Sequence, residues 1–375
     1  MAAIPLPLPL LIIAGFCAFL IIGIEQGVLG IFVAELGQLY DRDPEELGLF
    51  FALHGVGSAL VTGAALIPFI EERNHRRITI AALCMATGAW LVSGPAAWPL
   101  KLVASVLLGI GFGGLSMSFN TLFVTRFSQH NASLLNVLNA TYGLGAVAGP
   151  WILARQWLDG QGIFTLIAIA SALLAVLSIT IDDRVPSRDQ VTIEGARTGS
   201  IAPILSVAFL TLMIEAGLTY WVPSLLDTQG YGADVIADFM TTFFAWFVVI
   251  RLMAALTSAI FNTFIFAVFG HAGVFFTLTL VATGQLSLAD IGFIGAFMGI
   301  IFPNAYAWML NTSRGGTTTG AKIMLSAISG ATAGPYVLGW VLPLFGTTSV
   351  LVTLLIAGLL TICLMSVTQL KARSK

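Results

Sequence analysis

Long apolar stretches, separated by short polar segments, run through almost the whole chain. Each stretch supplies roughly the 20 mostly apolar residues that a helix needs to cross the hydrocarbon core of a bilayer. Helices are the expected spanning element, because lipid cannot satisfy the backbone hydrogen-bonding groups of open strands or loops. We predict spans near 8–36, 47–69, 78–94, 99–123, 133–156 and 162–181, and again near 201–226, 235–257, 261–282, 287–309, 320–343 and 347–368.

These twelve predicted spans fall into two sets of six, separated by the longest polar stretch of the chain. That stretch, 182–200, has the clustered charges of a linker, and an ordinary long loop would have the same composition. We predict an N-terminal half at 1–181, a cytoplasmic linker at 182–200 and a C-terminal half at 201–375. The least distinct boundary lies within 235–282, where a short uncharged connection separates two spans.

The composition supports a lipid environment. Hydrophobic residues make up 58% of the chain and charged residues only 9%, whereas a soluble domain has roughly 25% charged residues. The expected fold class is therefore an all-α membrane protein. The net charge of −2 and the lack of a basic patch argue against a nucleic-acid partner. The three cysteines lie singly in apolar stretches, so no disulfide framework is expected.

The distribution of Lys and Arg predicts the orientation in the membrane. With both termini in the cytoplasm, three basic residues fall outside (Arg42, Lys101 and Arg155) and Arg251 falls within a span. The remaining twelve fall inside: Arg73, Arg76, Arg77, Arg126, Arg184, Arg188, Arg197, Arg314, Lys322, Lys371, Arg373 and Lys375. This asymmetry favours cytoplasmic termini, and it supports an even number of spans.

The sequence of the first half recurs in the second. Residues 145–150 read Gly-Ala-Val-Ala-Gly-Pro and residues 330–335 read Gly-Ala-Thr-Ala-Gly-Pro, 185 positions apart. A second pair, Ile-Glu-Gln-Gly at 24–27 and Ile-Glu-Ala-Gly at 214–217, is 190 positions apart. Two matches on corresponding spans indicate an internal duplication. Paired halves that enclose a site near the bilayer midplane are a known plan of secondary transporters.

Two carboxylates lie near the middle of predicted spans, Glu25 and Glu215. An ionised carboxylate in contact with hydrocarbon is costly, so each should face a cavity, pair with a cation or hold a proton. Such a group can carry a coupling proton, and the repeat suggests that the two occupy equivalent positions. The alternative is a structural hydrogen bond to a neighbouring helix.

Arg251 is the basic residue deepest in a predicted span. It can snorkel to the cytoplasmic surface, or it can pair with a buried acid or an anionic substrate. We favour the structural role.

Polar and aromatic side chains recur on the spans expected to line a cavity. Amide, hydroxyl and aromatic groups suit the binding of a sugar, and the same groups commonly join helices to one another in membranes. The two interpretations are equally open for each residue of the set, which comprises Gln26, Asn120, Asn136, Asn139, Tyr142, Tyr220, Trp221, Asn304 and Trp308.

Several apparent motifs predict no chemistry. The glycine-rich run 109–114 imitates a dinucleotide fingerprint, but it lies inside a span, where close helix packing is expected. The histidines His54, His75, His130 and His271 lack metal-ligand spacing. No cofactor, metal, nucleotide-driven pump or enzyme is predicted.

The chain resembles the major facilitator superfamily, and more narrowly its fucose-permease-like branch of sugar–proton symporters. The resemblance rests on Glu72-Arg73-Asn74-His75-Arg76-Arg77 after the second span, on Asn120, on Asn136 with Gly143–Pro150, on Glu215 with Trp221-Val-Pro223, and on Ile301-Phe302-Pro303. His75 replaces a glycine of the family's loop. The branch's acidic residues correspond to about Gly30 and to Ser116, so its proton-carrying positions do not transfer. Any coupling must then use Glu25 or Glu215.

Together these features predict an alternating-access transporter of the bacterial inner membrane that moves a small, sugar-like solute with protons. Structural or gating roles are expected for Glu72, Arg73, Arg76, Arg77, Arg126, Gly149, Pro150, Arg251, Arg314, Gly334 and Pro335. The expected partners are the solute, the proton and the bilayer, and we expect a monomer. Two alternatives remain open: an efflux antiporter for drugs or metabolites, and a membrane sensor or assembly protein that has lost transport.

Overall fold

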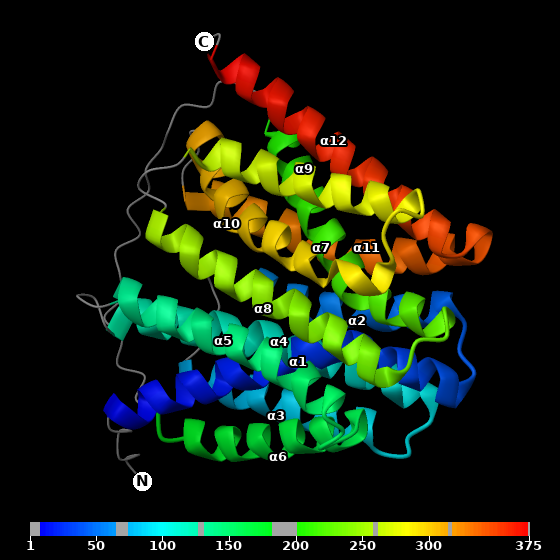
Figure 1. Ribbon diagram of the computed structural model, residues 1–375. Coiled ribbons are helices and arrows are strands. Elements are labelled where there is room, and N and C mark those ends of the chain that lie inside the picture. The colour runs from blue at the N-terminus through cyan, green and yellow to red at the C-terminus, as the bar shows by residue number, and fades with distance from the viewer. Residues whose placement is uncertain are drawn as a thin grey trace. The chain divides into compact units, whose positions relative to one another are not determined.

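A computed structural model describes residues 8–64, 74–126, 131–181, 201–257, 262–313 and 317–373, and these residues are almost entirely helical (Figure 1). The first six helices are α1 (Leu8–Tyr40), α2 (Pro44–Ala64), α3 (Asn74–Ser93), α4 (Trp98–Arg126), α5 (Asn131–Ala154) and α6 (Gly160–Ser178). The next are α7 (Ala202–Thr228), α8 (Ala233–Thr257), α9 (Thr263–Ala282), the short 3₁₀ helix η1 (Leu288–Phe293), α10 (Ile294–Ser313), α11 (Thr317–Phe345) and α12 (Thr347–Arg373).

The twelve α-helices in the described residues correspond to the twelve predicted spans, which confirms the fold class. Eleven of them are long and apolar enough to cross a membrane. The exception is α3, whose first turn carries His75, Arg76 and Arg77. The indistinct boundary within 235–282 is resolved at Asn262, whose side chain accepts a hydrogen bond from the Phe264 N–H and so caps the start of α9.

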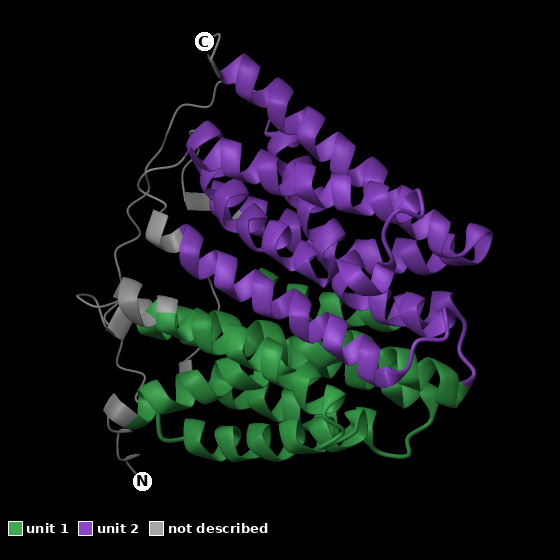
Figure 2. Cartoon of the chain, in the orientation of Figure 1, with its two compact units in different colours: residues 1–40, 50–189 green, residues 41–49, 190–375 purple. Residues whose placement is uncertain are grey.

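The described helices form two compact units, residues 1–40 with 50–189 and residues 41–49 with 190–375, so that the first turns of α2 are assigned to the second unit (Figure 2). In unit 1, α1 packs against α5 and α6, and α3 packs against α4 and α6. In unit 2, α7 packs against α11 and α12, and α9 packs against α10 and α12. Each unit therefore repeats the same set of helix contacts.

The repeated Gly-x-x-x-Gly-Pro segments lie at the same contact in both units. A Cβ atom on Gly145 of α5 would overlap the backbone carbonyl of Leu20 on α1. One on Gly330 of α11 would overlap the backbone carbonyl of Phe209 on α7. Glycine is needed here because it lets two helix backbones approach closely, which is how small residues join membrane helices.

The glycine-rich run in α4 is also a packing surface, as the sequence predicts. A side chain on Gly109 would overlap the backbone of His54 on α2, and one on Gly111 would overlap Met85 on α3. In unit 2 a side chain on Gly295 of α10 would overlap the backbone of Phe243 on α8. These contacts fix how α2 and α8 are set along their partners.

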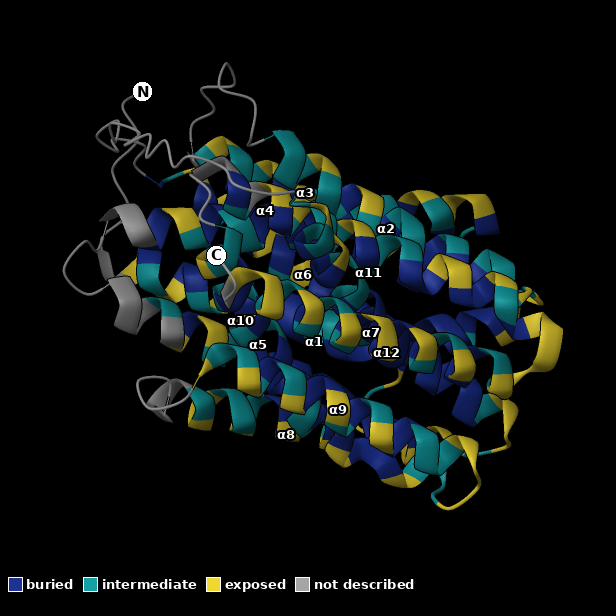
Figure 3. Ribbon diagram, turned by 90° about the horizontal axis from the view of Figure 1, so that it is seen from above, coloured by how far each residue is buried: buried dark blue, intermediate teal, exposed yellow. Residues whose placement is uncertain are grey.

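Large apolar side chains remain exposed along single faces of several helices (Figure 3). On α6 they are Leu166, Ile169, Leu173 and Val176, which follow helical spacing, while the opposite face of the helix is buried. On α9 they are Ile265, Phe269 and Phe276. Exposed apolar stripes of this length suit contact with lipid rather than water.

A buried lysine closes the end of α3. The ammonium group of Lys101 donates to the backbone carbonyls of Leu91, Val92 and Gly94 at 3.3, 2.6 and 2.6 Å. It also lies 5.3 Å from the ring centre of Tyr40. A cation at the C-terminus of a helix satisfies carbonyls that have no intrahelical partner and complements the helix dipole. Lys101 therefore has a structural role.

We predict that Gly145→Ala and Gly330→Ala each destabilise the protein by about 1–3 kcal/mol, because the added methyl group forces two helix backbones apart. The apparent melting temperature in detergent measures this effect. Gly63→Ala in α2 is the matched control, since a Cβ atom there meets no neighbour within 4 Å. Equal stability of all three variants would contradict the packing role.

Candidate functional site

The middle of unit 1 contains a buried carboxylate–imidazole pair. Oε1 of Glu25 on α1 lies 3.0 Å from Nε2 of His54 on α2. Glu25 has no exposed surface and His54 is only 4% exposed. Both side chains lie within helices long and apolar enough to span a membrane. Two ionisable groups thus face one another where neither can be solvated by water.

The hydrogen bonding of this pair is incomplete. The contact has ion-pair distance without hydrogen-bond geometry, and among the described residues neither Glu25 oxygen has a hydrogen-bond partner. The His54 ring packs against Phe112 of α4 at a centroid distance of 5.8 Å, and Phe112 contacts the ring of Tyr142 on α5 at 6.5 Å. Buried polar groups are normally satisfied, so this arrangement calls for a functional explanation.

The neighbouring helices supply little other charge. The helices α5 and α6, which pack against α1, contain no Asp, Glu, Lys, Arg or His. The only charged residues of α4 are Lys101 and Arg126 at its two ends, and Lys101 is bonded to backbone carbonyls. His54 is therefore the ionisable side chain that faces Glu25 in the described part of unit 1.

A pair of this kind can hold and release a proton. Imidazole accepts a proton in the physiological range, and a carboxylate stabilises the resulting cation. The proton would lie between the carboxylate and the imidazole, whose facing atoms are 3.0 Å apart. Access of water from one side or the other would then load or unload it.

Sequence reasoning identified Glu25 but missed His54. The spacing of the histidines bears only on metal binding, whereas the useful signal for His54 is an ionisable residue inside an apolar span. His271 on α9 shows the contrast: its Nδ1 contacts the carbonyl of Ala267 at 2.8 Å and its Nε2 contacts the Thr211 hydroxyl at 3.2 Å. Since both of its ring nitrogens have partners, His271 is a satisfied structural residue.

Glu215 has a different environment. It is half-buried on α7, and its Oε2 has no hydrogen-bond partner among the described residues. Its carboxylate interacts electrostatically with Arg251 of α8. Arg251 donates from Nε to the carbonyl of Gly299 on α10 at 3.1 Å and lies 3.9 Å from the ring centre of Phe247. Arg251 thus joins α8 to α10 and also interacts with the half-buried Glu215.

The polar residues predicted in unit 1 whose side chains are described lie at half-buried or exposed positions. Gln26, Asn120 and Tyr142 are half-buried, and Asn139 is exposed. Asn120 donates to the carbonyl of Ser116, and Asn139 to that of Leu135, at 2.9 and 2.8 Å. Each bond uses one amide N–H on its own helix and leaves a second donor and the carbonyl oxygen. The Asn136 side chain lies outside the described residues.

The aromatic residues predicted in unit 2 are enclosed. Trp221 is fully buried, and its Nε1–H donates to the carbonyl of Pro335 on α11 at 2.8 Å. Trp308 is also buried and donates to Oε1 of Gln369 on α12 at 2.8 Å. Tyr220 is buried beside Trp221, while Asn304 is half-buried and bonded to the carbonyl of Ile300. Both tryptophans therefore join helices, and a role toward solute stays a prediction for all four residues.

Comparison with known proteins now identifies the family. The sequence profile described as Major Facilitator Superfamily matches residues 11–334. The chain belongs to the Major Facilitator Superfamily. It is thus a multi-pass membrane transporter of that superfamily. No curated protein matches the chain in sequence.

Solved structures of superfamily transporters share the fold. A D-xylose–proton symporter matches with a TM-score of 0.73 at 14% identity, covering 95% of this chain and 96% of that one. The nucleoside transporter NupG matches with a TM-score of 0.73 at 12% identity, covering 96% and 97%. A bacterial homologue of the human lysosomal transporter Spinster matches with a TM-score of 0.70 at 12% identity, covering 97% and 98%. At these identities the likeness establishes the fold alone.

The residues predicted to have gating roles are only partly described. Arg76 is exposed and Arg77 half-buried on the first turn of α3. Pro150 and Pro335 lie inside α5 and α11, each directly after the second glycine of its repeat. Glu72, Arg73 and Arg314 lie outside the described residues, as does the side chain of Arg126. Their gating roles in this superfamily member stay predictions.

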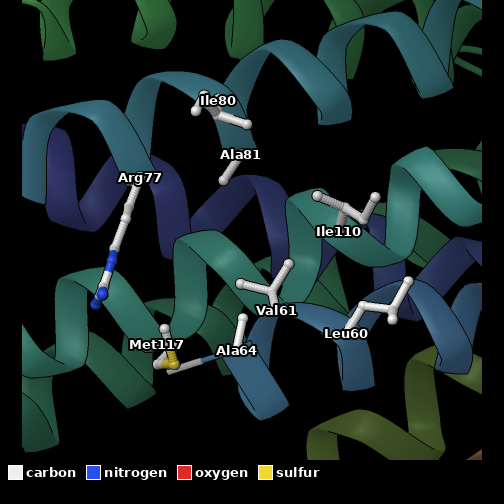
Figure 4. Close-up of a pocket in the computed structure, with 8 residues that line it drawn as sticks. All are labelled: Leu60, Val61, Ala64, Arg77, Ile80, Ala81, Ile110 and Met117. Atoms are coloured by element: carbon white, nitrogen blue, oxygen red, sulfur yellow. The ribbon is translucent and has the colours of Figure 1, made fainter. Parts of the chain in front are cut away.

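A cavity of about 230 Å³ lies in unit 1 between α2, α3 and α4 (Figure 4). Apart from Arg77 its lining is apolar: Leu60, Val61, Ala64, Ile80, Ala81, Ile110 and Met117. Leu60 and Ile80 are also among the exposed large apolar side chains. A polar solute would find few hydrogen-bonding groups here, so this cavity is a poor candidate for the transport site.

We predict that Trp221→Phe lowers the stability of the protein by about 1–3 kcal/mol, because a buried carbonyl loses its donor and the core loses volume. Thermal unfolding in detergent measures the loss. Trp340→Phe on α11 is the matched control, since Trp340 is half exposed. If both variants unfold at the same temperature as the parent, Trp221 does not have the packing role assigned to it.

Proposed function

We propose that this protein is a proton-coupled secondary active transporter of a small, sugar-like solute. The observation that carries the proposal is the buried Glu25–His54 pair in the membrane-spanning part of unit 1. Coupling needs a group that binds a proton within the bilayer and releases it when access changes. A carboxylate beside an imidazole, both cut off from water, meets that need.

Energetics support a functional reason for the pair. Replacing a buried ion pair by well-packed apolar residues is often neutral or stabilising by about 1–4 kcal/mol. The Glu25 oxygens also lack hydrogen-bond partners among the described residues, so the pair contributes less to stability than a satisfied network would. A costly arrangement of this kind is typical of a site that performs chemistry.

The polar groups of unit 1 support a polyhydroxylated solute. Gln26, Asn120, Asn139 and Tyr142 offer amide and hydroxyl groups at half-buried or exposed positions. Such groups can replace the water bound to sugar hydroxyls, and an aromatic ring can pack on the C–H face of a sugar. Structures with this fold are described as transporters of D-xylose and of nucleosides, and both kinds of solute carry a pentose.

We further propose the bacterial inner membrane as the location, with both termini in the cytoplasm. The excess of Lys and Arg in the segments assigned to the inside supports this orientation. A reporter fused after Lys375 tests it, because activity of a cytoplasm-specific reporter is expected and activity of a periplasm-specific one is not.

Glu25→Gln is expected to abolish accumulation driven by a pH gradient in proteoliposomes while preserving exchange of labelled for unlabelled solute. An inward gradient of one pH unit can sustain about a tenfold solute gradient for each coupled proton. We expect this gradient to collapse to about onefold in the variant, because a neutral amide cannot bind and release the proton. Labelled D-xylose and uridine are the first solutes to measure.

Glu45→Gln is the matched control, since Glu45 lies in the first turn of α2 rather than in the middle of a span. It should accumulate solute like the parent. Solute leaving against an opposing proton flux would favour the efflux antiporter. Intact folding without flux across a broad panel of sugars, nucleosides and lipophilic cations would favour the sensor or assembly protein. Unchanged coupling in Glu25→Gln would overturn the proton assignment.

A further inference from the structure

We infer that the proton site exists in one unit only, formed by Glu25 and His54, and that Glu215 is the counterpart of Gln26 rather than of Glu25. Glu215 then has a different task, the binding of solute hydroxyl groups. This inference rests on the proposed function and assigns separate roles to two acids that sequence reasoning treated as equivalent.

The close glycine contacts fix which residues of α1 and α7 correspond. Gly145 meets the backbone of Leu20, and Gly330, its equivalent in the repeat, meets the backbone of Phe209. One turn further, Gly149 meets Ile24 and Gly334 meets Met213. In both comparisons, residues of α1 and α7 that make the same contact are 189 positions apart. The sequence match Ile-Glu-x-Gly instead pairs residues that are 190 positions apart.

The same displacement holds on the second pair of helices. The backbone of His54 on α2 meets Gly109, and the backbone of Phe243 on α8 meets Gly295. One turn further, Ser58 meets Gly113 and Phe247 meets Gly299. Residues of α2 and α8 that make the same contact are again 189 positions apart.

This register changes the assignment of the acids. Glu25 corresponds to Ile214, His54 corresponds to Phe243, and Glu215 corresponds to Gln26. Burial agrees: Glu25 and Ile214 are 0% and 1% exposed, while Gln26 and Glu215 are both half-buried. Since one residue turns an α-helix by about 100°, the sequence match would have placed Glu215 on the wrong face of α7.

Unit 2 therefore has two apolar residues, Ile214 and Phe243, at the positions where unit 1 has its ionisable pair. Both are almost fully buried, so the same packing position accepts aliphatic and aromatic side chains. The fold does not need charge at this contact. We attribute the retention of Glu25 and His54 in unit 1 to proton binding.

The charged groups around each acid support the separate roles. Glu25 faces His54. Among the helices packed against α1, α5 has Tyr142 as its titratable residue and α6 has none, while the charged residues of α4, Lys101 and Arg126, lie at its two ends. Glu215 interacts with Arg251. The two ring nitrogens of His271 in unit 2 contact the Thr211 hydroxyl and the Ala267 carbonyl. Arg251 interacts electrostatically with the Glu215 carboxylate, and a carboxylate paired with a guanidinium can accept hydrogen bonds from two neighbouring solute hydroxyls.

The first test needs no solute. Infrared difference spectra of the purified protein, recorded as the pH is lowered, should show a change in the stretching band of a carboxyl or carboxylate group, because the Glu25–His54 pair gains a proton. This band should vanish in Glu25→Gln and persist in Glu215→Gln. Its loss in Glu215→Gln with persistence in Glu25→Gln would overturn the inference.

The second test builds the pair of unit 2 into unit 1. The double variant Glu25→Ile with His54→Phe should unfold at a temperature at least as high as the parent, because both side chains fill a position that the fold packs with apolar groups. Glu25→Ile alone should unfold earlier, since it leaves His54 buried without its carboxylate. A double variant less stable than Glu25→Ile alone would contradict the equivalence.

The third test separates proton binding by Glu25 from solute binding by Glu215. It measures transport of D-xylose or uridine, according to which of the two solutes the proteoliposomes take up. The double variant should retain exchange and lose accumulation driven by a pH gradient. The Glu215→Gln variant should have a KM at least tenfold higher than the parent and should still accumulate solute at saturating concentration. The parent should move one proton with each solute molecule. Loss of coupling in Glu215→Gln, or two protons per solute, would overturn the division of roles. A parent that moves neither solute would refute the proposed function, and the infrared and stability results would still decide the assignment of the proton site.

Discussion

The close approach of helix backbones at glycine positions is the constraint on which the described structure depends. In a bilayer, apolar side chains gain little by leaving lipid, so helices associate through tight packing and polar contacts. Gly145 and Gly330 allow α1 to meet α5 and α7 to meet α11 without intervening side chains. Gly109 and Gly295 do the same for α2 and α8. These contacts fix how far each helix is displaced and turned against its neighbour.

That register brings Glu25 and His54 together. The two residues lie on the consecutive helices α1 and α2, and each alone would be an isolated ionisable group in an apolar span. Once α1 is set by α5 and α2 by α4, the carboxylate and the imidazole lie at ion-pair distance with Phe112 against the imidazole ring. The rigid packing thus buries an ionisable pair away from water, which is the arrangement on which the proposed proton coupling rests.

The two units share their packing and differ in their chemistry. Corresponding helices make corresponding contacts, yet the positions of Glu25 and His54 hold Ile214 and Phe243 in unit 2. Duplication provides a scaffold whose contacts are retained while individual side chains change. Unit 2 joins its helices with the indole groups of Trp221 and Trp308, and it holds its acid beside Arg251. The predicted solute-binding residues of unit 1 whose side chains are described, Gln26, Asn120, Asn139 and Tyr142, lie on α1, α4 and α5 at half-buried or exposed positions.

Hydrophobic stretches and their polar interruptions were enough to predict every helix, since the bilayer imposes a minimum apolar length and forbids unsatisfied backbone. The repeated Gly-Pro segment was likewise readable, because duplication leaves identical residues in both halves. The sequence also marked Glu25, but it offered no reason to choose His54 as its partner, and it aligned Glu215 one residue out of place. Partners and faces depend on how helices are displaced against one another, and only the packed glycine contacts specify that displacement, because a one-residue shift leaves composition and hydropathy unchanged while turning a side chain to another face.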